Sequence, residues 1–148
     1  MNRERLLNVA RALRESKKPE EFTMHFYAAD CGTPACALGH YAARHDLQDC
    51  FALDQDGDLV EVGTDDGEGF QLLTSWDFAD VLNHFGITLD EADKLFSSHG
   101  CSGATTPIEA AEYIEQFVER HEEEARQART EDARDQYENN AYDRGGDR

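Results

Sequence analysis

The stretch Phe51-Ala-Leu-Asp-Gln-Asp-Gly-Asp-Leu-Val-Glu-Val62 predicts where this chain forms a β-sheet. Two short apolar runs flank the connector Asp54-Gln-Asp-Gly-Asp58, whose residues are typical of tight turns. A third short apolar run, Phe70-Gln-Leu-Leu73, follows a glycine-containing segment. We therefore expect one small antiparallel sheet or hairpin near residues 50–73.

Helical patterns lie on both sides of this predicted sheet. Thr88-Leu-Asp-Glu91 and Thr106-Pro-Ile-Glu109 have the sequence of a capping box, and Gly86 is a favourable helix terminator. Thr33 followed by Pro34 is a further start signal. Helices are expected near residues 3–16, 34–43, 76–85, 88–98 and from 107 onward.

The apolar stripe of the last helix predicts where the folded part of the chain ends. The stripe consists of Ile108, Ala111, Ile114, Phe117 and Val118. Beyond it the chain lacks an apolar face, so we expect a solvated helical extension at about 121–134 and a disordered tail after it. The predicted fold class is mostly α (α+β): a compact helical domain at 1–120, with the small sheet, and a charged extension at 121–148.

The net charge of the chain excludes several classes of function. Thirty-two acidic and fourteen basic residues give a formal charge of −18 over 148 residues. Phosphates repel such a chain, so direct binding to nucleic acid is not expected, and neither is binding to an anionic membrane surface. The sequence contains no run of about 18 apolar residues and no signal-peptide core. We expect a cytoplasmic protein with reduced cysteines.

The acidity is concentrated in the middle of the chain. Residues 46–94 contain fourteen acidic residues and one basic residue, whereas residues 1–45 contain five acidic and seven basic residues. Residues 115–148 contain eleven acidic and six basic residues. The excess of carboxylates therefore falls on segments that are predicted to fold.

Clustered carboxylates on an ordered scaffold can imitate the charge of a phosphate backbone and steer association with a basic surface. We interpret the chain as an acidic protein-interaction module for a basic, nucleic-acid-binding protein, for example as a phage- or plasmid-type inhibitor. An alternative is that the acidity serves only solubility or adaptation to salt. The candidate partner-binding residues are Asp54, Asp56, Asp58, Glu61, Asp65, Asp66, Glu68, Asp77, Asp80, Asp90 and Glu91.

Two motifs in the acidic region resemble known sites but lack essential residues. Asp54, Asp56 and Asp58 match the first ligands of a calcium-binding EF-hand loop, but Leu59 and Asp65 stand where that loop needs glycine and glutamate. Residues 78–96 have the spacing of a helix-turn-helix, but their acidic charge opposes a DNA groove. We expect a hairpin turn at the first and a structural helical pair at the second.

Cysteine and histidine residues offer an alternative function. Cys36 and His40 are four residues apart on one predicted helix, and their side chains could bind zinc together with others. Cys36 also falls near a helix start, where the helix dipole would lower the pKa of a thiol. A thiol-dependent activity is therefore a further alternative, although no catalytic residue is assigned. The candidate zinc ligands are Cys31, Cys36, His40, His99 and Cys101.

The segment Cys31-Gly-Thr-Pro-Ala-Cys-Ala-Leu-Gly-His-Tyr-Ala42 resembles a group of small bacterial and phage proteins. These proteins share the motif Cys-Gly-Thr-x-x-Cys-x-x-Gly-(Trp/His)-x-Ala, and the resemblance covers about residues 22–118. It implies an architecture and a bacterial or phage setting, and the group has no assigned activity. Because the group often has Trp where this chain has His40, the resemblance favours a packing role for His40. Weaker matches are Phe22-Thr-Met24, Phe85-Gly86, Leu95-Phe96, Thr106-Pro107 and Ala110-Ala111.

Overall fold

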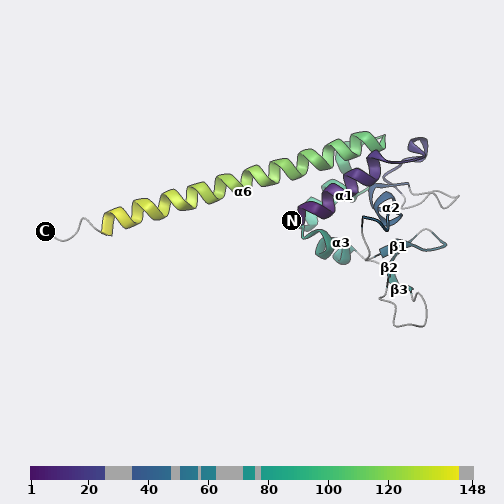
Figure 1. Cartoon of the computed structure of the whole chain (residues 1–148), viewed down its shortest axis with the longest axis horizontal. Helices are drawn as coiled ribbons and strands as arrows, with labels where there is room; N and C mark the ends of the chain where they lie inside the picture. The colour runs from purple at the N-terminus through teal and green to yellow at the C-terminus, as the bar shows by residue number, and fades with distance from the viewer. Residues whose placement is uncertain (26–34, 48–50, 57, 63–71, 76–77, 144–148) are drawn as a thin grey trace. The chain divides into compact units, whose positions relative to one another are not determined.

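The computed structural model has a mostly helical fold with one small antiparallel sheet, as the sequence predicts (Figure 1). The chain consists of two compact units, Met1–Glu115 and Gln116–Arg148. The structure describes residues 1–25, 35–47, 51–56, 58–62, 72–75 and 78–143.

The described part of the chain contains helices on both sides of three short strands. The helices are α1 (Arg3–Arg14), the 3-10 turn η1 (Pro19–Glu21), α2 (Ala37–Ala42), α3 (Phe78–Phe85), α4 (Leu89–Phe96), α5 (Gly100–Gly103) and α6 (Pro107–Asp143). The strands are β1 (Phe51–Leu53), β2 (Leu59–Val62) and β3 (Leu72–Ser75).

Helix α1 begins with a side-chain cap and buries an apolar stripe. The side-chain oxygen of Asn2 accepts a hydrogen bond from the N–H of Arg5 at 3.1 Å, which satisfies a donor that the first turn leaves free. Leu6, Val9 and Leu13 are fully buried at helical spacing. Helix α1 contacts α2, and α2 in turn contacts β1, so α2 connects the helical part to the sheet.

The three strands form an antiparallel sheet in the order β1-β2-β3. Leu53 pairs with Leu59 beside the first turn, which confirms the predicted hairpin. Val60 pairs with Ser75, and an irregularity in register follows before Val62. The third strand is described over Leu72–Ser75, and Phe70 and Gln71 of the predicted run lie outside the described residues.

Helices α3 and α4 form the helical pair that the sequence predicts. Gly86 between them has a φ of +60°, a left-handed conformation that glycine adopts without a steric penalty. Thr88 and Glu91 form the predicted capping box at the start of α4. Phe85, Leu95 and Phe96 are buried, and the rings of the two phenylalanines lie 5.1 Å apart.

A close backbone approach fixes the turn after α4. A Cβ atom on Gly100 would lie 2.7 Å from the carbonyl oxygen of Leu95, which explains why glycine is needed there. Cys101 and Ser102 follow with left-handed φ values of 51° and 56°. Such conformations are costly for residues with side chains, so the surrounding packing must hold this turn in place.

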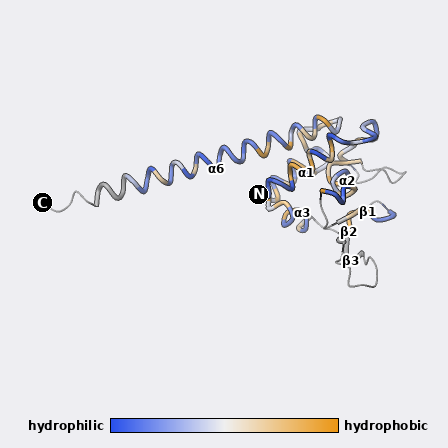
Figure 2. The backbone as a smooth tube through the Cα atoms, viewed as in Figure 1, coloured by the Kyte–Doolittle hydropathy of each residue, from blue (hydrophilic) through white to orange (hydrophobic). Residues whose placement is uncertain are grey.

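Helix α6 differs from its prediction at both ends. Ile108 was expected on the buried stripe but is 43% exposed, whereas Ala110, Ala111 and Ile114 are buried. The helix does not end near residue 134 but continues through Asp143. Hydrophilic residues predominate along most of its length, as Figure 2 shows. Side-chain contacts such as Glu123 with Arg126, at 2.8 Å, lie along its exposed surface.

Candidate functional site

The turn between β1 and β2 is organised by Asp54. One of its carboxylate oxygens accepts hydrogen bonds from the N–H groups of Asp56 and Asp58, at 2.9 and 3.0 Å. The backbone N–H of Asp54 donates to the carbonyl oxygen of Asp58 at 3.0 Å. The strands on both sides confirm a hairpin turn where the sequence partly resembles an EF-hand loop. Asp54 therefore holds the turn together.

Asp56 and Asp58 occupy the same turn but remain exposed. Their carboxylates form no ion pair or hydrogen bond within the part of the chain that the structure describes. Their backbone positions are fixed by Asp54, while their charges face no counter-charge in that part. Such carboxylates are suited to contact a partner.

Three other predicted partner-binding residues lie on α3 and α4, away from this turn in the sequence. Asp90 forms an ion pair with Lys94, one helical turn later. Glu91 accepts hydrogen bonds from the N–H and the hydroxyl group of Thr88, at 2.8 and 3.1 Å. Asp80 is half-buried in the first turn of α3. Asp90 and Glu91 thus have structural roles within their own helix.

The predicted acidic residues therefore fall into two described groups, one on the β1–β2 turn and one on α3 and α4. Other members of the predicted set, Asp65, Asp66, Glu68 and Asp77, lie outside the described residues, and so does the side chain of Glu61. A single shared acidic face remains a prediction.

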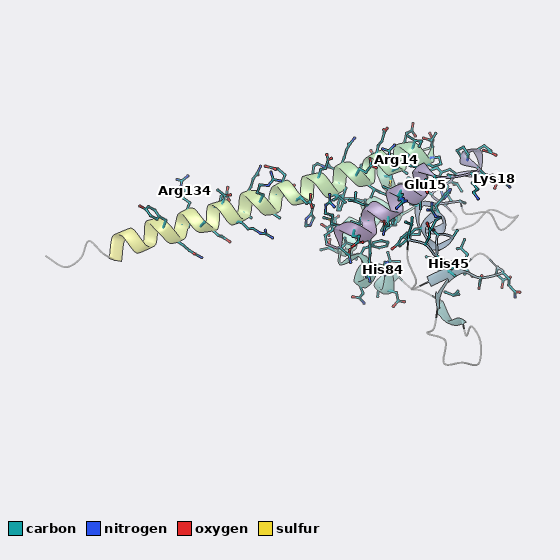
Figure 3. All side chains as sticks on the ribbon, in the orientation of Figure 1. Arg14, Glu15, Lys18, His45, His84 and Arg134 are labelled. Carbon is teal, nitrogen blue, oxygen red and sulfur yellow. The ribbon has the colours of Figure 1, made fainter. Side chains whose placement is uncertain are left out.

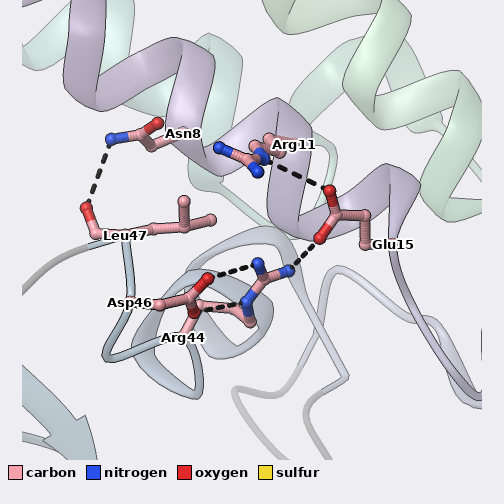
Figure 4. A network of polar contacts seen from close by, with 6 residues as sticks. All are labelled: Asn8, Arg11, Glu15, Arg44, Asp46 and Leu47. Atoms are coloured by element: carbon pink, nitrogen blue, oxygen red, sulfur yellow. Dashed lines mark hydrogen bonds and ion pairs between the residues drawn. The ribbon is translucent and has the colours of Figure 1, made fainter.

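The basic residues near the end of α1 are arranged very differently (Figure 4). Two nitrogens of Arg44 donate to the two carboxylate oxygens of Asp46, both at 2.7 Å, and a third donates to Glu15 at 2.6 Å. Glu15 also accepts from Arg11 at 3.2 Å. These contacts lower the pKa of Asp46 to about 2, mainly through the hydrogen bond from Arg44, and they also lower the pKa of Glu15.

Two further basic residues of this region form ion pairs. Arg14 binds both carboxylate oxygens of Glu115, at 2.9 and 2.7 Å. Lys18 pairs with Glu21 at 3.1 Å. Figure 3 shows Arg14, Glu15 and Lys18 near the same end of α1. Positive charge is therefore largely neutralised here by side chains of the same unit.

Cys36 lies one position before α2 rather than inside its first turn, because the helix begins at Ala37. Its sulfur accepts a hydrogen bond from the N–H of Gly39 at 3.4 Å, so Cys36 is the N-cap. Thr33 and Pro34, the predicted start, lie outside the described residues. Burial raises the pKa of Cys36 to about 11, which corrects the expectation of a lowered thiol pKa.

Cys101 is a second buried free thiol. Its sulfur donates a hydrogen bond to the carbonyl oxygen of Leu95 at 3.3 Å. Burial raises its pKa to about 12, and the charge of Cys36 adds to this effect. The fold has therefore brought Cys36 and Cys101 within electrostatic range of each other. Both thiols are buried, and their raised pKa values disfavour the thiolate near pH 7.

His40 is 6% exposed, and both of its ring nitrogens have protein partners. Nδ1 lies 2.9 Å from the carbonyl oxygen of Cys36, and Nε2 lies 2.9 Å from the hydroxyl oxygen of Ser16. The ring also packs against Phe22, with centroids 6.0 Å apart. Burial lowers the pKa of His40, so the imidazole is neutral near pH 7.

The predicted zinc ligands are only partly placed by the structure. His99 is exposed beside α5, and its Nδ1 lies 3.0 Å from the hydroxyl oxygen of Ser98. Cys31 lies outside the described residues. Among the residues that the structure describes, no three His, Cys, Asp or Glu side chains are grouped as metal ligands. Zinc binding by a set that includes Cys31 remains a prediction.

A pocket of about 510 Å³ opens beside the Ser16–His40 contact. Sequence reasoning did not find this pocket, because Ser16 follows α1 as an ordinary polar residue and His40 was considered only as a metal ligand or a packing residue. The pairing depends on the contact between α1 and α2, which the local pattern does not specify. The lining residues are Ala12, Glu15, Ser16, Lys17, Lys18, His40, Ala43 and Arg44.

Comparison with family models, with curated proteins and with solved structures finds no match to this chain. None of the helices in the described part of the chain combines the length and the apolar composition needed to cross a bilayer.

Proposed function

We propose that this chain is an acidic protein-interaction module that binds a basic surface of a nucleic-acid-binding protein. The observation that carries the proposal is the composition of segment 46–94, which contains fourteen acidic residues and one basic residue. Its one basic residue, Lys94, is already paired with Asp90. A basic residue from outside the segment, Arg44, neutralises Asp46.

The β1–β2 turn supplies the best-defined part of this interaction surface. Asp54 fixes the backbone, so Asp56 and Asp58 are presented without the large loss of conformational entropy that a flexible tail would suffer on binding. Unpaired surface carboxylates raise the rate of encounter with a positive surface, and this effect weakens as salt increases. Binding should therefore be strongest at low ionic strength.

A nucleic-acid-binding protein is the partner class that best fits this charge. Its binding surface is built to attract closely spaced negative charges, and carboxylates at several positions can compete for it. An inhibitor encoded by a phage or plasmid, acting in the bacterial cytoplasm, is the form of this function that we propose.

The experiment compares two variants with the same change in net charge. One replaces Asp56, Asp58, Asp65 and Asp66 by asparagine and leaves the structural Asp54 intact. The control replaces Glu119, Glu124 and Glu131 by glutamine and Asp132 by asparagine, all on exposed positions of α6. Each immobilised protein is incubated with a bacterial lysate at low salt and then eluted with duplex DNA.

The proposal predicts that the wild-type chain and the α6 control retain a protein that duplex DNA elutes, whereas the four-aspartate variant retains much less. Loss of retention at high salt is also expected, because the contact is electrostatic. If no DNA-eluted protein is retained at low salt, or if the four-aspartate variant retains as much as the wild type, the proposed function is wrong.

A further inference from the structure

The contact between Ser16 and His40 has an arrangement that a packing role does not require. Ser16 follows the end of α1, and His40 lies on α2, so the contact joins two elements. The hydroxyl oxygen of Ser16 lies 2.9 Å from Nε2, and the carbonyl oxygen of Cys36 lies 2.9 Å from Nδ1. A nucleophile beside a base, with the base oriented by a third group, is the geometry of an activated serine.

The donors and acceptors in this contact can be assigned from chemistry. A carbonyl oxygen can only accept, so Nδ1 of His40 carries the proton and donates to Cys36. Nε2 of the neutral ring is then an acceptor, and Ser16 donates its hydroxyl proton to it. The lone pairs of the Ser16 oxygen are left free, which favours nucleophilic attack over binding of an anion.

The surroundings of Ser16 supply space and a hydrogen-bond donor. The adjacent pocket of about 510 Å³ is within the size range of small-molecule sites. The backbone N–H of Lys17, the residue after Ser16, has no acceptor among the described residues. The N–H after a nucleophile stabilises the oxyanion in many serine hydrolases, and Lys17 lines the same pocket as Ser16.

We propose that Ser16 is the nucleophile, and His40 the general base, of an acyl-transfer site for small carboxylic esters. The Ser16 oxygen attacks the ester carbonyl carbon while its proton passes to Nε2 of His40. The alcohol then leaves with that proton, and the acyl group stays on Ser16 as an ester. A water molecule, deprotonated by His40, attacks this ester and releases the carboxylic acid and Ser16. The backbone carbonyl of Cys36 acts as a positioning group that holds the tautomer.

The experiment uses the full-length chain with 4-nitrophenyl acetate. Release of 4-nitrophenolate is followed together with the position of the transferred acetyl group, which is mapped by mass spectrometry. Ser16→Ala removes the nucleophile. His40→Asn keeps a donor for the Cys36 carbonyl but removes Nε2. Ser98→Ala is the matched control, because Ser98 also contacts a histidine, His99 at 3.0 Å, on an exposed surface.

The proposal predicts acetylation of Ser16 in the wild type and in the Ser98 variant. Ser16→Ala and His40→Asn should each reduce the rate at least about tenfold. Acetylation of lysines alone, or an unchanged rate in Ser16→Ala, would overturn the proposal. Circular dichroism reports whether His40→Asn folds, and if it does not, the Ser16 variant and the mapped site of acetylation decide the matter.

Discussion

The β1–β2 turn and the junction of α1 with α2 show two different uses of charge in one small domain. At the junction, Arg44 contacts two carboxylates, and Glu15 contacts two guanidinium groups (Figure 4). At the turn, Asp56 and Asp58 are exposed and have no counter-charge within the described residues. Charge that is neutralised internally supports the fold, whereas charge without a counter-ion is available to a partner.

The α1–α2 junction and the β1–β2 turn also differ in the polar groups that they bury. The junction covers neutral, buried groups with complete hydrogen bonding, among them His40 and Cys36. At the turn, the carboxylate of Asp54 accepts hydrogen bonds from two exposed backbone N–H groups. Substitutions should therefore affect stability at the junction and binding at the turn.

The largest effect on stability is expected in the core of the junction. Leu13 on α1 is fully buried, so Leu13→Ala should lower the free energy of unfolding by about 3 kcal/mol, through lost burial and a residual cavity. Leu89→Ala is the control, because Leu89 is 64% exposed, and its cost should stay within about 0.5 kcal/mol. Urea denaturation measures both. Equal losses would show that α1 does not form the core described here.

Thiol reactivity tests whether the cysteines near this junction are inert. The experiment uses a chain in which Cys31 and Cys50 are replaced by serine. At pH 8, Cys36 and Cys101 of the folded chain should react with a disulfide reagent about a hundredfold more slowly than in the chain unfolded by urea. The reason is burial, which raises the pKa values to about 11 and about 12. Rapid reaction of the folded protein would restore the thiol-dependent alternative.

A smaller effect should separate the two kinds of aspartate within the turn. Asp54→Ala removes the acceptor of two backbone N–H groups and should cost about 1 kcal/mol of stability. Asp56→Ala should change stability by less than about 0.5 kcal/mol. Thermal unfolding of the two variants provides the comparison. A larger loss for Asp56 would mean that this residue, too, is structural.

The smallest effect is expected in the pH dependence of stability. Burial holds the pKa of His40 in the folded chain below its ordinary value of 6.5. The unfolded chain then binds more protons at mildly acidic pH, so the stability that neutral His40 contributes is present above pH 6.5 and is lost as the pH falls toward the folded pKa. Wild type should therefore lose more stability than His40→Asn between about pH 7.5 and 5. Identical slopes would contradict this account.

The sequence predicted the parts of the fold that depend on local chemistry. The capping box of Thr88 and Glu91, the terminator Gly86 and the hairpin around Asp54 are all confirmed, because each depends on neighbouring residues. The start of α2 was misplaced, since Cys36 takes the cap position. The predicted burial of Ile108 was also wrong, because a stripe of apolar residues on a helix does not show which of its edges packs against the core.

The site was harder to predict than the fold. The contact of Ser16 with His40 joins residues that are 24 positions apart in the sequence, and the motif around His40 does not include Ser16. The same holds for the burial of Cys36, which raises its pKa to about 11, whereas its position near a helix start predicted a lowered pKa. Acidic composition, in contrast, is visible in the sequence, but the structural roles of Asp54 and Asp90 are not.

We propose that the acidic segment binds its partner because of where its carboxylates lie in the fold, and not because of the total charge of the chain. The most direct test measures the dissociation constant of a DNA-eluted partner at low salt for the wild type, for the Asp56, Asp58, Asp65 and Asp66 variant, and for the α6 control of equal charge. We predict a loss of about tenfold or more for the first variant and a change within about twofold for the control. Equal weakening by both variants would contradict the claim and would favour acidity as a bulk property.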